Sequence, residues 1–396
     1  MDIRRLEEAE LSGKTALVRV DFNLPRGEDG EVTDLTRLEA AVPTIQHLRE
    51  AGASVVLLSH FGRPKNGPDA ENSLGFVPPL LAEALQAPVR FLASPNINVR
   101  DTLEPGDVLL LENTRFLDGE TDNVDALARD LAAYGDLFVM DAFSAAHRAH
   151  ASSYGVAQHL PTYAGLAMAR ELDHLAQALE HPAKPVMAIV GGAKVSTKID
   201  LLENLVQKLD RLAIGGGMAN TFLLTKGLDV GKSLAEAELI GKATDILKAA
   251  ARANCEIILP SDVVVATEFK AGADTQVRAR DAVRSDEIIL DVGPDTVSEI
   301  MDAMDKSETL IWNGPLGAFE TPPFDTSTIE CAKYAAKLAG RGDIVAVAGG
   351  GDTVAALAAA NAVDDFTFVS TAGGAFLEWM EGKRLPGVEI VTKGSA

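Results

Sequence analysis

Short apolar runs recur along the chain, and each is followed by a polar or glycine-rich stretch. Most of these runs are continuous rather than alternating, which is typical of strands that are covered on both faces. Helical patterns lie between many of them, as in Leu38, Ala41, Val42, Ile45 and Leu48, whose spacing suits one helix face. We predict strands at residues 15–20, 54–58, 108–111, 137–140, 186–190, 211–214, 256–259, 309–312, 344–348 and 366–369.

This repeated order of strand, helix and strand predicts an α/β protein built from doubly wound parallel sheets. Ligands of such sheets bind beyond the carboxyl ends of the strands. The predicted strands of the first half end at polar side chains: Asp21, Asn23, His60, Arg63, Glu112, Arg115 and Asp141. Those of the second half lead into glycine-rich turns at 191–194, 215–217, 313–315 and 349–352. These two groups are therefore the candidate binding residues.

The middle of the chain is predicted to connect two domains. Met168, Leu172, Leu175 and Leu179 form one apolar stripe, and Pro182 ends the helix. Up to residue 183 the chain has 13 Arg and 2 Lys, whereas from 184 onward it has 7 Arg and 14 Lys. An ordinary packing helix and solvated surface charges are the alternatives. We predict two Rossmann-like domains joined by a helix and hinge: residues 1–165, a connecting helix at 166–183, a second domain at 184–379, and a tail at 380–396 that returns to the first domain.

The composition of the chain excludes several classes of protein. The 396 residues carry a net charge of −22, and 47% of them are hydrophobic, which argues against a disordered chain and against nonspecific binding to nucleic acid or anionic membranes. No apolar run is long enough to span a membrane, and the N-terminus lacks a signal peptide, so we expect a cytoplasmic protein. Cys255 and Cys331 are too few for a disulfide framework or a cysteine-rich zinc site.

Two glycine-rich turns of the second half suit a phosphate. GGAKVSTK (191–198) follows a predicted strand and is expected to open a helix, whose positive end attracts anions and would place Lys194 and Lys198 on one face. AGGGDT (348–353) has the same form, and Asp352 there could hold Mg²⁺ or cap the next helix.

Two familiar nucleotide-binding patterns fail. The stretch at 227–233 has one residue too few between its glycines for a P-loop and is interpreted as a helix boundary. The stretch at 349–354 lacks the last small residue of the dinucleotide fingerprint, which weakens a dehydrogenase interpretation.

The ordered set of motifs resembles the phosphoglycerate kinase family of bacterial type over essentially the whole chain. The resemblance is carried by VRVDFNLP (18–25), SHFGRP (59–64), LLENTRF (110–116), DAFSAAHRAHAS (141–152), GGAKVSTK, GGGMANTF (215–222), WNGPLGAFE (312–320), AGGGDT and STAGGAFLEWMEGK (370–383).

The resemblance implies a Mg²⁺-dependent phosphotransferase of glycolysis and gluconeogenesis. Such an enzyme moves a phosphoryl group reversibly between 1,3-bisphosphoglycerate and ADP, giving 3-phosphoglycerate and ATP, with in-line transfer on hinge closure. The first domain is expected to bind the glycerate and the second the nucleotide. The family is usually monomeric, so we expect a monomer with small-molecule substrates and no nucleic-acid or membrane partner.

The matching motifs also imply roles for individual residues. Arg37 and Lys194 are the expected catalytic residues, and Asp352 is the expected Mg²⁺ ligand. Substrate binding is assigned to Asp21, Phe22, Asn23, Arg37, His60, Phe61, Gly62, Arg63, Arg115 and Arg148. Nucleotide binding is assigned to Lys198, Glu320, Gly350, Gly351, Asp352 and Thr353.

Departures from the family pattern leave alternatives open. Ser144 and Ala145 stand where the family commonly has Gly-Thr, and Ala372 replaces a glycine in a turn that could require a positive φ. A non-catalytic relative that binds phosphometabolites, and a dinucleotide-dependent dehydrogenase, are the two competing functions.

Overall fold

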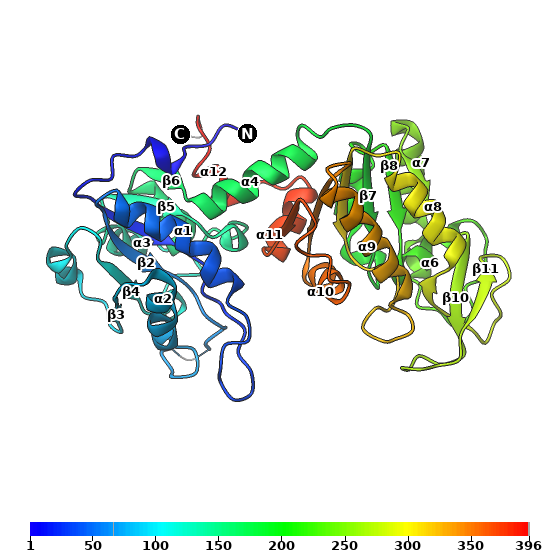
Figure 1. Ribbon diagram of the computed structural model, residues 1–396, viewed down its shortest axis with the longest axis horizontal. Helices are drawn as coiled ribbons and strands as arrows, with labels where there is room; N and C mark the ends of the chain where they lie inside the picture. The colour runs from blue at the N-terminus through cyan, green and yellow to red at the C-terminus, as the bar shows by residue number, and fades with distance from the viewer. Residues whose placement is uncertain (66, 395–396) are drawn as a thin grey trace. The chain divides into compact units, whose positions relative to one another are not determined.

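The protein divides into two compact units, seen here in a computed structural model that describes residues 1–65 and 67–394. Unit 1 comprises Met1–Asp173 and Arg384–Ala396, and unit 2 comprises His174–Lys383. The division falls within helix α4 (Leu166–Leu179), drawn in green in Figure 1.

Helix α4 buries its apolar stripe as predicted. Met168, Leu172, Leu175 and Leu179 are each at most 9% exposed. Among the described residues, no helix combines the length and hydropathy that crossing a membrane requires.

Unit 1 contains a six-stranded sheet in the order β3-β4-β2-β1-β5-β6, with every pair parallel. Its strands are β1 (Thr15–Arg19), β2 (Ser54–Leu58), β3 (Val89–Leu92), β4 (Val108–Leu111), β5 (Leu137–Met140) and β6 (Thr162–Ala164). Its helices besides the first part of α4 are α1 (Thr36–Glu50), α2 (Val77–Leu85), α3 (Asp125–Ala132) and α12 (Pro386–Glu389).

The central strands of unit 1 are continuous apolar runs because both faces of the sheet are covered. All residues of β1, β2, β4 and β5 are buried. One face packs on helix α1, whose Leu38, Ile45 and Leu48 share a core with Val55 and Leu57 of β2. This packing confirms the helix predicted around Leu38, although Val42 is only partly buried.

Unit 2 contains a second parallel sheet in the order β15-β14-β13-β7-β8-β9. Its strands are β7 (Val186–Val190), β8 (Arg211–Ile214), β9 (Glu256–Ile258), β13 (Thr309–Asn313), β14 (Val345–Gly349) and β15 (Phe368–Ser370). Its helices besides the second part of α4 are α5 (Ile199–Leu205), α6 (Gly216–Thr225), α7 (Ile240–Ala253), α8 (Pro294–Met304), α9 (Thr326–Gly340), α10 (Gly351–Ala359) and α11 (Gly373–Met380). The predicted α/β class with two doubly wound parallel sheets is confirmed.

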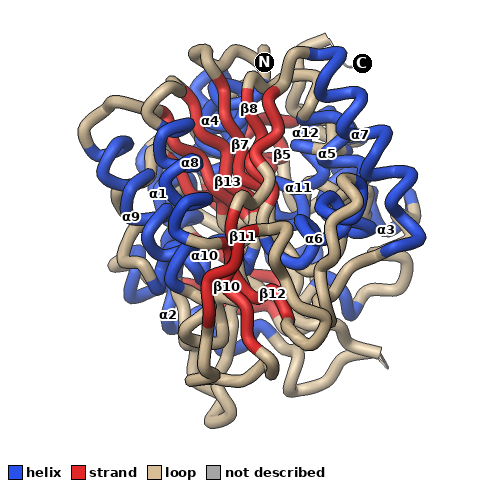
Figure 2. The backbone as a smooth tube through the Cα atoms, turned by 90° about the vertical axis from the view of Figure 1, so that its right-hand side faces the viewer, coloured by secondary structure: helices blue, strands red, loops and turns tan. Residues whose placement is uncertain are grey.

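Unit 2 also holds a small antiparallel sheet that the strand pattern did not predict. Its strands are β10 (Asp262–Ala266), β11 (Gln276–Ala279) and β12 (Ile288–Val292), in the order β11-β10-β12. In Figure 2 this sheet lies beside helix α6, which contacts β12. The antiparallel sheet therefore extends unit 2 on the side of helix α6.

Candidate functional site

Three glycine-rich turns of unit 2 meet at the carboxyl ends of neighbouring strands. They follow β7, β13 and β14, and β13 lies between the other two strands and pairs with both. The Asn313 Nδ2 donates to the Gly349 carbonyl (2.7 Å), and the Gly314 N–H donates to the Thr353 hydroxyl (2.7 Å). Turns that lie far apart in sequence thus form one continuous surface.

Lys198 lies at the base of these turns. Its Nζ donates to the carbonyls of Gly191 (2.6 Å) and Asn313 (3.0 Å) and to the Asn313 Oδ1 (2.6 Å). Burial lowers the pKa of Lys198 to about 8, although the nearby Asp352 carboxylate works in the opposite direction. An ammonium has three protons, so a phosphate here must replace at least one of these contacts.

Lys194 is placed differently from the prediction. It has an extended backbone (φ −135°, ψ 134°), is exposed, and precedes a 3₁₀ turn, η8 (Val195–Thr197). Helix α5 begins only after Lys198. The expectation that Lys194 and Lys198 share one helix face is therefore wrong, because the glycine-rich loop continues further than the sequence pattern indicated.

The AGGGDT turn opens helix α10 as expected. Gly350 has a φ of +100°, and a Cβ there would lie 2.9 Å from the Asn313 Nδ2, so this position requires glycine. The N-cap position belongs to Gly350, which leaves Asp352 exposed in the first turn rather than capping the helix. Thr353 is buried and acts as the acceptor for Gly314.

Asp352 fits a cation that arrives with its own oxygen ligands. Within residues 1–65 and 67–394, no group of three or more His, Cys, Asp or Glu side chains could hold a metal ion. Mg²⁺ is commonly held by one or two carboxylates together with substrate phosphates and water. The residues present therefore suit a nucleotide-bound Mg²⁺ and not a cage made by the protein alone.

The substitution of Ala372 for glycine causes no backbone conflict. Ala372 precedes helix α11 with a φ of −100°, and its N–H donates to the Ser370 hydroxyl (3.2 Å). A negative φ is open to any residue, so the requirement for glycine considered from the sequence does not apply here.

A largely apolar pocket of about 560 Å³ adjoins the turns of unit 2. Predicted residues at this pocket are Glu320 and Asp352. The sequence analysis did not identify its apolar walls, which include Leu234, Phe269, Leu290, Leu316 and Phe319. Two of these residues, Phe269 and Leu290, lie in the unpredicted antiparallel sheet region, so no strand pattern indicated them. A pocket of this volume suits one small organic molecule.

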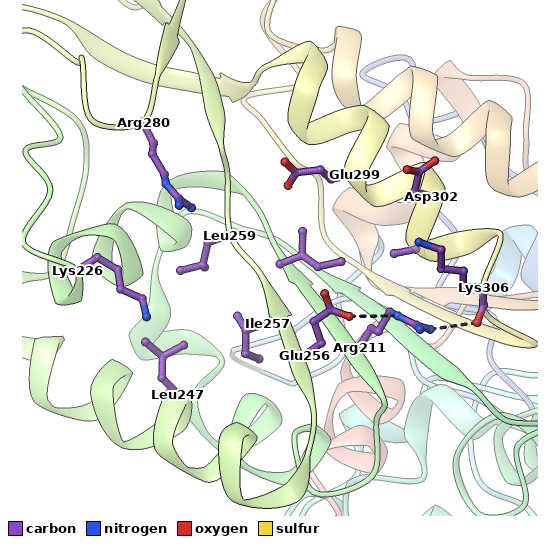
Figure 3. A pocket seen from close by; sticks show the side chains of 12 residues that line it. Arg211, Lys226, Leu247, Glu256, Ile257, Leu259, Arg280, Glu299, Asp302 and Lys306 are labelled. Atoms are coloured by element: carbon purple, nitrogen blue, oxygen red, sulfur yellow. Dashed lines mark hydrogen bonds and ion pairs between the residues drawn. The ribbon is translucent and has the colours of Figure 1, made fainter.

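A second pocket of about 520 Å³ in unit 2 is lined by charged residues (Figure 3). Arg211 pairs there with Glu256 (Nε to Oε2, 3.3 Å) and donates to the Lys306 carbonyl (3.0 Å). Arg211 and Glu256 thus satisfy each other, and none of the predicted site residues lines this pocket. It is therefore a weaker candidate than the glycine-rich surface.

Unit 1 gathers a cluster of cations at the carboxyl end of its sheet. Burial and the neighbouring charges of Arg148, Arg19 and Arg63 lower the pKa of Arg115. Arg115 also donates to the Gly62 carbonyl (2.6 Å). Several guanidiniums that repel one another across a partly buried surface form a site prepared for an anion.

His60 belongs to the same cluster and is neutral. Burial, followed by the charges of Arg19, Arg115 and Arg148, lowers the pKa of His60 to about 2. The Arg19 guanidinium lies 3.1 Å from the His60 Nδ1. Since a guanidinium can only donate, the Nδ1 accepts and the ring proton sits on Nε2. His60 is thus a neutral hydrogen-bond donor.

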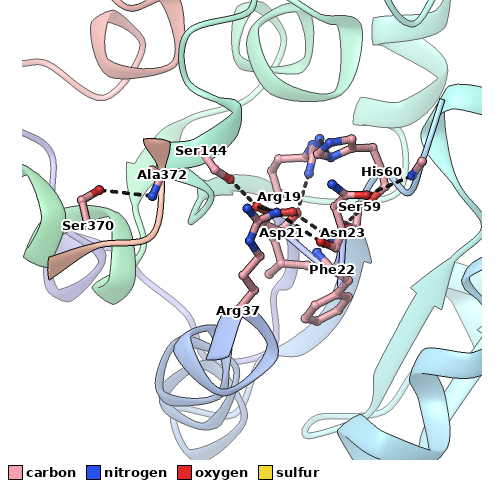
Figure 4. A network of polar contacts seen from close by, with 12 residues as sticks. Arg19, Asp21, Phe22, Asn23, Arg37, Ser59, His60, Ser144, Ser370 and Ala372 are labelled. Carbon is pink, nitrogen blue, oxygen red and sulfur yellow. Dashed lines mark hydrogen bonds and ion pairs between the residues drawn. The ribbon is translucent and has the colours of Figure 1, made fainter. Parts of the chain in front are cut away.

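Asp21, Asn23 and Arg37 form a second part of the unit 1 site (Figure 4). Asp21 lies between Arg37 (Oδ2 to Nη1, 3.1 Å) and the Ser144 hydroxyl, which donates to the same carboxylate. Arg37 also donates to the Asn23 carbonyl (3.1 Å). Ser144, a departure from the family pattern, is therefore integrated into the network.

The remaining predicted residues of unit 1 lie on the loops that follow strands β1, β2 and β5. The Asn23 Oδ1 accepts from the Gly62 N–H (2.9 Å), and the Phe22 N–H donates to the Ser59 hydroxyl (2.8 Å). Phe61 packs edge-to-face on Phe76, with ring centroids 5.1 Å apart.

The two remaining predicted arginines also belong to unit 1. Arg148 donates to the His147 Nε2 (2.9 Å), and Arg63 is exposed. The predicted residues of this unit thus gather at one edge of its sheet.

Arg19 was not among the predicted site residues. It is 1% exposed, its Nε donates to the Ser152 hydroxyl (3.1 Å), and Ser152 in turn donates to the buried Glu120. The available signal was an arginine inside an otherwise apolar predicted strand, since a buried charge requires polar partners.

Comparisons with known proteins agree with the motif pattern. The family model described as phosphoglycerate kinase matches residues 6–383. The phosphoglycerate kinase of Maricaulis maris (strain MCS10) is 59% identical over 394 residues, covering 98% of each chain. That of Sinorhizobium fredii (strain NBRC 101917 / NGR234) is 57% identical over 398 residues, covering 99% of this chain and 100% of the relative.

Solved structures give the same result. The phosphoglycerate kinase from Coxiella burnetii is 43% identical, with a TM-score of 0.93 and complete coverage of both chains. The phosphoglycerate kinase from Pyrococcus horikoshii OT3 is 28% identical, with a TM-score of 0.77 and 98% of each chain covered.

Proposed function

Since this chain belongs to the phosphoglycerate kinase family and transfers a phosphoryl group reversibly between 1,3-bisphosphoglycerate and ADP, we propose that its two units each bind one substrate. Unit 1 takes the phosphoglycerate and unit 2 takes the nucleotide. The cation cluster around Arg115 is the observation that carries this division.

The unit 1 site offers separate contacts for the two ends of the glycerate. His60, Arg63, Arg115 and Arg148 would bind the phosphate that is not transferred, because they supply concentrated positive charge and a neutral donor. Asp21 and Asn23 would contact the hydroxyl and carboxyl region. Arg37, held by Asp21, would reach the transferring group.

The unit 2 site offers a phosphate surface next to an apolar pocket. The pocket beside Leu316 and Phe319 suits the nucleobase, and Glu320 suits the ribose hydroxyls. Lys198 and the backbone of Gly350, Gly351 and Thr353 would contact the phosphates. Asp352 would hold Mg²⁺, which would neutralise charge on the nucleotide phosphates.

The chemistry needs positioning and charge neutralisation more than proton transfer. In the ATP-consuming direction the nucleophile is the carboxylate of 3-phosphoglycerate, which is already ionised at neutral pH. No general base is required, which suits a neutral His60. Arg37 and Lys194 would neutralise the charge that spreads over the transferring phosphoryl group. In-line transfer requires the two bound substrates to meet, which is the physical reason for the hinge closure expected from the sequence.

The experiment is to measure ADP formation from MgATP with and without 3-phosphoglycerate. We expect turnover that depends on 3-phosphoglycerate. Replacing Arg115 by Ala should raise the KM for 3-phosphoglycerate by about 10- to 100-fold, because one charge-assisted contact is lost. Arg129→Ala, which removes an exposed arginine paired with Asp125 in helix α3, is the matched control and should behave as the wild type.

The alternatives make different predictions. The family assignment argues against the dehydrogenase, whereas a non-catalytic relative would bind both ligands without turnover. An unchanged KM in Arg115→Ala would overturn the assignment of the unit 1 site. The proposal also includes a cytoplasmic location and a monomeric state. Light scattering measures the mass in solution and so tests the monomeric state.

A further inference from the structure

The turn that carries Lys194 is held by a carboxylate from a distant part of the chain. Glu236 accepts from the Ser196 N–H (Oε2, 2.9 Å) and from the Ser196 hydroxyl (Oε1, 2.6 Å). Ser196 belongs to the turn η8 and lies two residues after Lys194. Both carboxylate oxygens of Glu236 therefore act on one residue of the turn.

Glu236 is itself attached to helix α6. Its N–H donates to the Thr221 hydroxyl (3.0 Å), and the Asn220 Nδ2 donates to the Leu234 carbonyl (3.0 Å). Asn220 and Thr221 are each 1% exposed, so these anchors are fixed by packing. The segment from Leu234 to Glu236 thus connects a rigid helix with the Lys194 turn.

The charge of Lys194 also acts on the Glu236 carboxylate. Burial works against the ionised form, but the hydrogen bonds from Ser196 and the charge of Lys194 together lower the pKa of Glu236. The carboxylate is ionised at neutral pH, when it strengthens the two hydrogen bonds to Ser196. The mechanism above assigns this group no role.

We propose that Glu236 is a positioning residue for phosphoryl transfer, which holds the Lys194 turn through Ser196 so that Lys194 meets the transferring group. This inference rests on the proposed function, in which Lys194 neutralises charge on that group. Lys194 is exposed and precedes only a short 3₁₀ turn, so its backbone has little support from regular helix. The contact from Glu236 supplies that support.

The test compares four variants by steady-state kinetics with MgATP and 3-phosphoglycerate. Glu236→Ala removes the contact and should lower kcat by about 10-fold, with little change in either KM, because misplacement of a group that acts in the transition state affects kcat. Glu236→Gln can still accept a hydrogen bond and should retain most of the kcat. Ser196→Ala should have an intermediate kcat. Glu238→Gln, at an exposed position two residues away, is the matched control.

A double variant separates positioning from a general loss of stability. Ser196→Ala combined with Glu236→Ala should have no lower kcat than Glu236→Ala alone, since both act through one contact. Multiplied losses in kcat, or a wild-type kcat in a folded Glu236→Ala variant, would overturn the inference.

Hydrogen exchange supplies a readout that does not depend on activity. The amides of residues 193–198 should exchange several-fold faster in Glu236→Ala than in the wild type and in Glu238→Gln. Unchanged exchange would contradict the contact. Absence of turnover in the wild type would instead contradict the proposed function, so the two failures can be distinguished.

Discussion

At the residue scale, the environment of each charged group determines what it can do. His60 and Lys198 are both perturbed by burial, but with different outcomes. The lowered pKa of His60, about 2, keeps its ring neutral at every physiological pH, whereas the pKa of Lys198 is lowered only to about 8. The two residues therefore give different predictions for ligand binding: His60 should add no pH dependence, and Lys198 should add one near pH 8.

His60 should give no titration in the binding of 3-phosphoglycerate. Because its pKa is lowered to about 2, the ring carries no charge to lose between pH 5.5 and 7.5. His60→Ala should weaken binding by about 10-fold by removing one donor to a charged ligand, and by the same factor at each pH. Calorimetric titration across this range checks both points. A loss of affinity confined to the acid side would show that His60 binds as a cation.

Lys198 should take up a proton when the nucleotide binds. With a pKa of about 8 it is half deprotonated at pH 8, and a nearby phosphate favours the charged form. We expect uptake of about half a proton per MgADP at pH 8, and none from Lys198 at pH 6.5 where it is already charged. Calorimetry in buffers of different ionisation enthalpy measures the uptake. Lys198→Gln should abolish it, and equal heats in all buffers for the wild type would contradict the prediction.

Sequence reasoning found charged residues at strand ends more readily than those inside strands. Arg63 and Arg115 follow predicted strands, where parallel sheets place their ligands, so position alone indicated them. Arg19 lies within β1, and its contact with His60 depends on the pairing of β1 with β2, which local sequence does not reveal. The Glu236 contact with Ser196 joins positions 40 residues apart and has no local signal.

At the scale of elements, Asp141 links strand β5 to the start of helix α4. Its Oδ1 accepts from the N–H groups of Ala167 (3.0 Å) and Met168 (3.2 Å) in the first turn of that helix. Gly165 packs against this carboxylate so closely that a Cβ would lie 2.2 Å from it. The structure thus gives an anchoring role to Asp141, which its position after a predicted strand had placed among the candidate binding residues.

Asp141 should make the stability of unit 1 depend on pH. Burial raises its pKa to about 7, so between pH 4 and 7 the folded state binds more protons than the unfolded state and stability falls as pH rises. Asp141→Asn should remove this decline and should therefore be more stable relative to the wild type at pH 8 than at pH 5. Asp141→Ala should cost about 1 kcal/mol at pH 5 through loss of the helix cap.

Scanning calorimetry at several pH values measures these differences. Parallel stability profiles for the wild type and Asp141→Asn would contradict a raised pKa. Retention of wild-type stability in Asp141→Ala would contradict the capping role.

Element prediction succeeded where burial imposes a simple pattern. Strands covered on both faces, such as β1, β2 and β7, are continuous apolar runs, and the sequence showed them. β3 and β6 are short or partly exposed strands, and β11 is mostly exposed, so neither alternation nor an apolar run marks them. In the antiparallel sheet, β10 does have a mostly buried apolar run at residues 263–266, which our strand prediction missed, whereas its edge strand β11 could be found only in the folded structure.

At the scale of the whole molecule, both ends of the chain belong to unit 1. Ile3 pairs with Thr392, and the Arg4 side chain and N–H donate to the carbonyls of Ile390 and Val391 (2.7 Å each). Gly387 donates from its N–H to the Ala146 carbonyl (2.8 Å), next to the loop that carries Arg148. The last segment of the chain thus completes unit 1, whose other residues are all in the range Met1–Asp173.

Removal of residues 384–396 should consequently unfold unit 1 and leave unit 2 intact. The segment buries Leu385, Val388 and Val391, each at most 3% exposed, and apolar side chains of this size contribute about 1.5–3 kcal/mol each. Their sum approaches the total stability of an ordinary domain. Val391→Ala alone should lower the stability of unit 1 by about 1–3 kcal/mol. Lys393→Ala, which removes an exposed partner of Asp2 and Glu8, is the control and should leave the unfolding midpoint unchanged.

The two tryptophans make this prediction measurable, because Trp312 and Trp379 both lie in unit 2. Their fluorescence should report an unchanged unfolding transition of unit 2 in the truncated chain, while circular dichroism loses the signal of unit 1. Binding of 3-phosphoglycerate should be lost, and MgADP should still bind, because the proposed nucleotide residues all lie before residue 384. Simultaneous loss of both transitions would show that unit 2 depends on unit 1 for its stability. Retention of 3-phosphoglycerate binding would show that the returning segment is not needed to form the cation cluster.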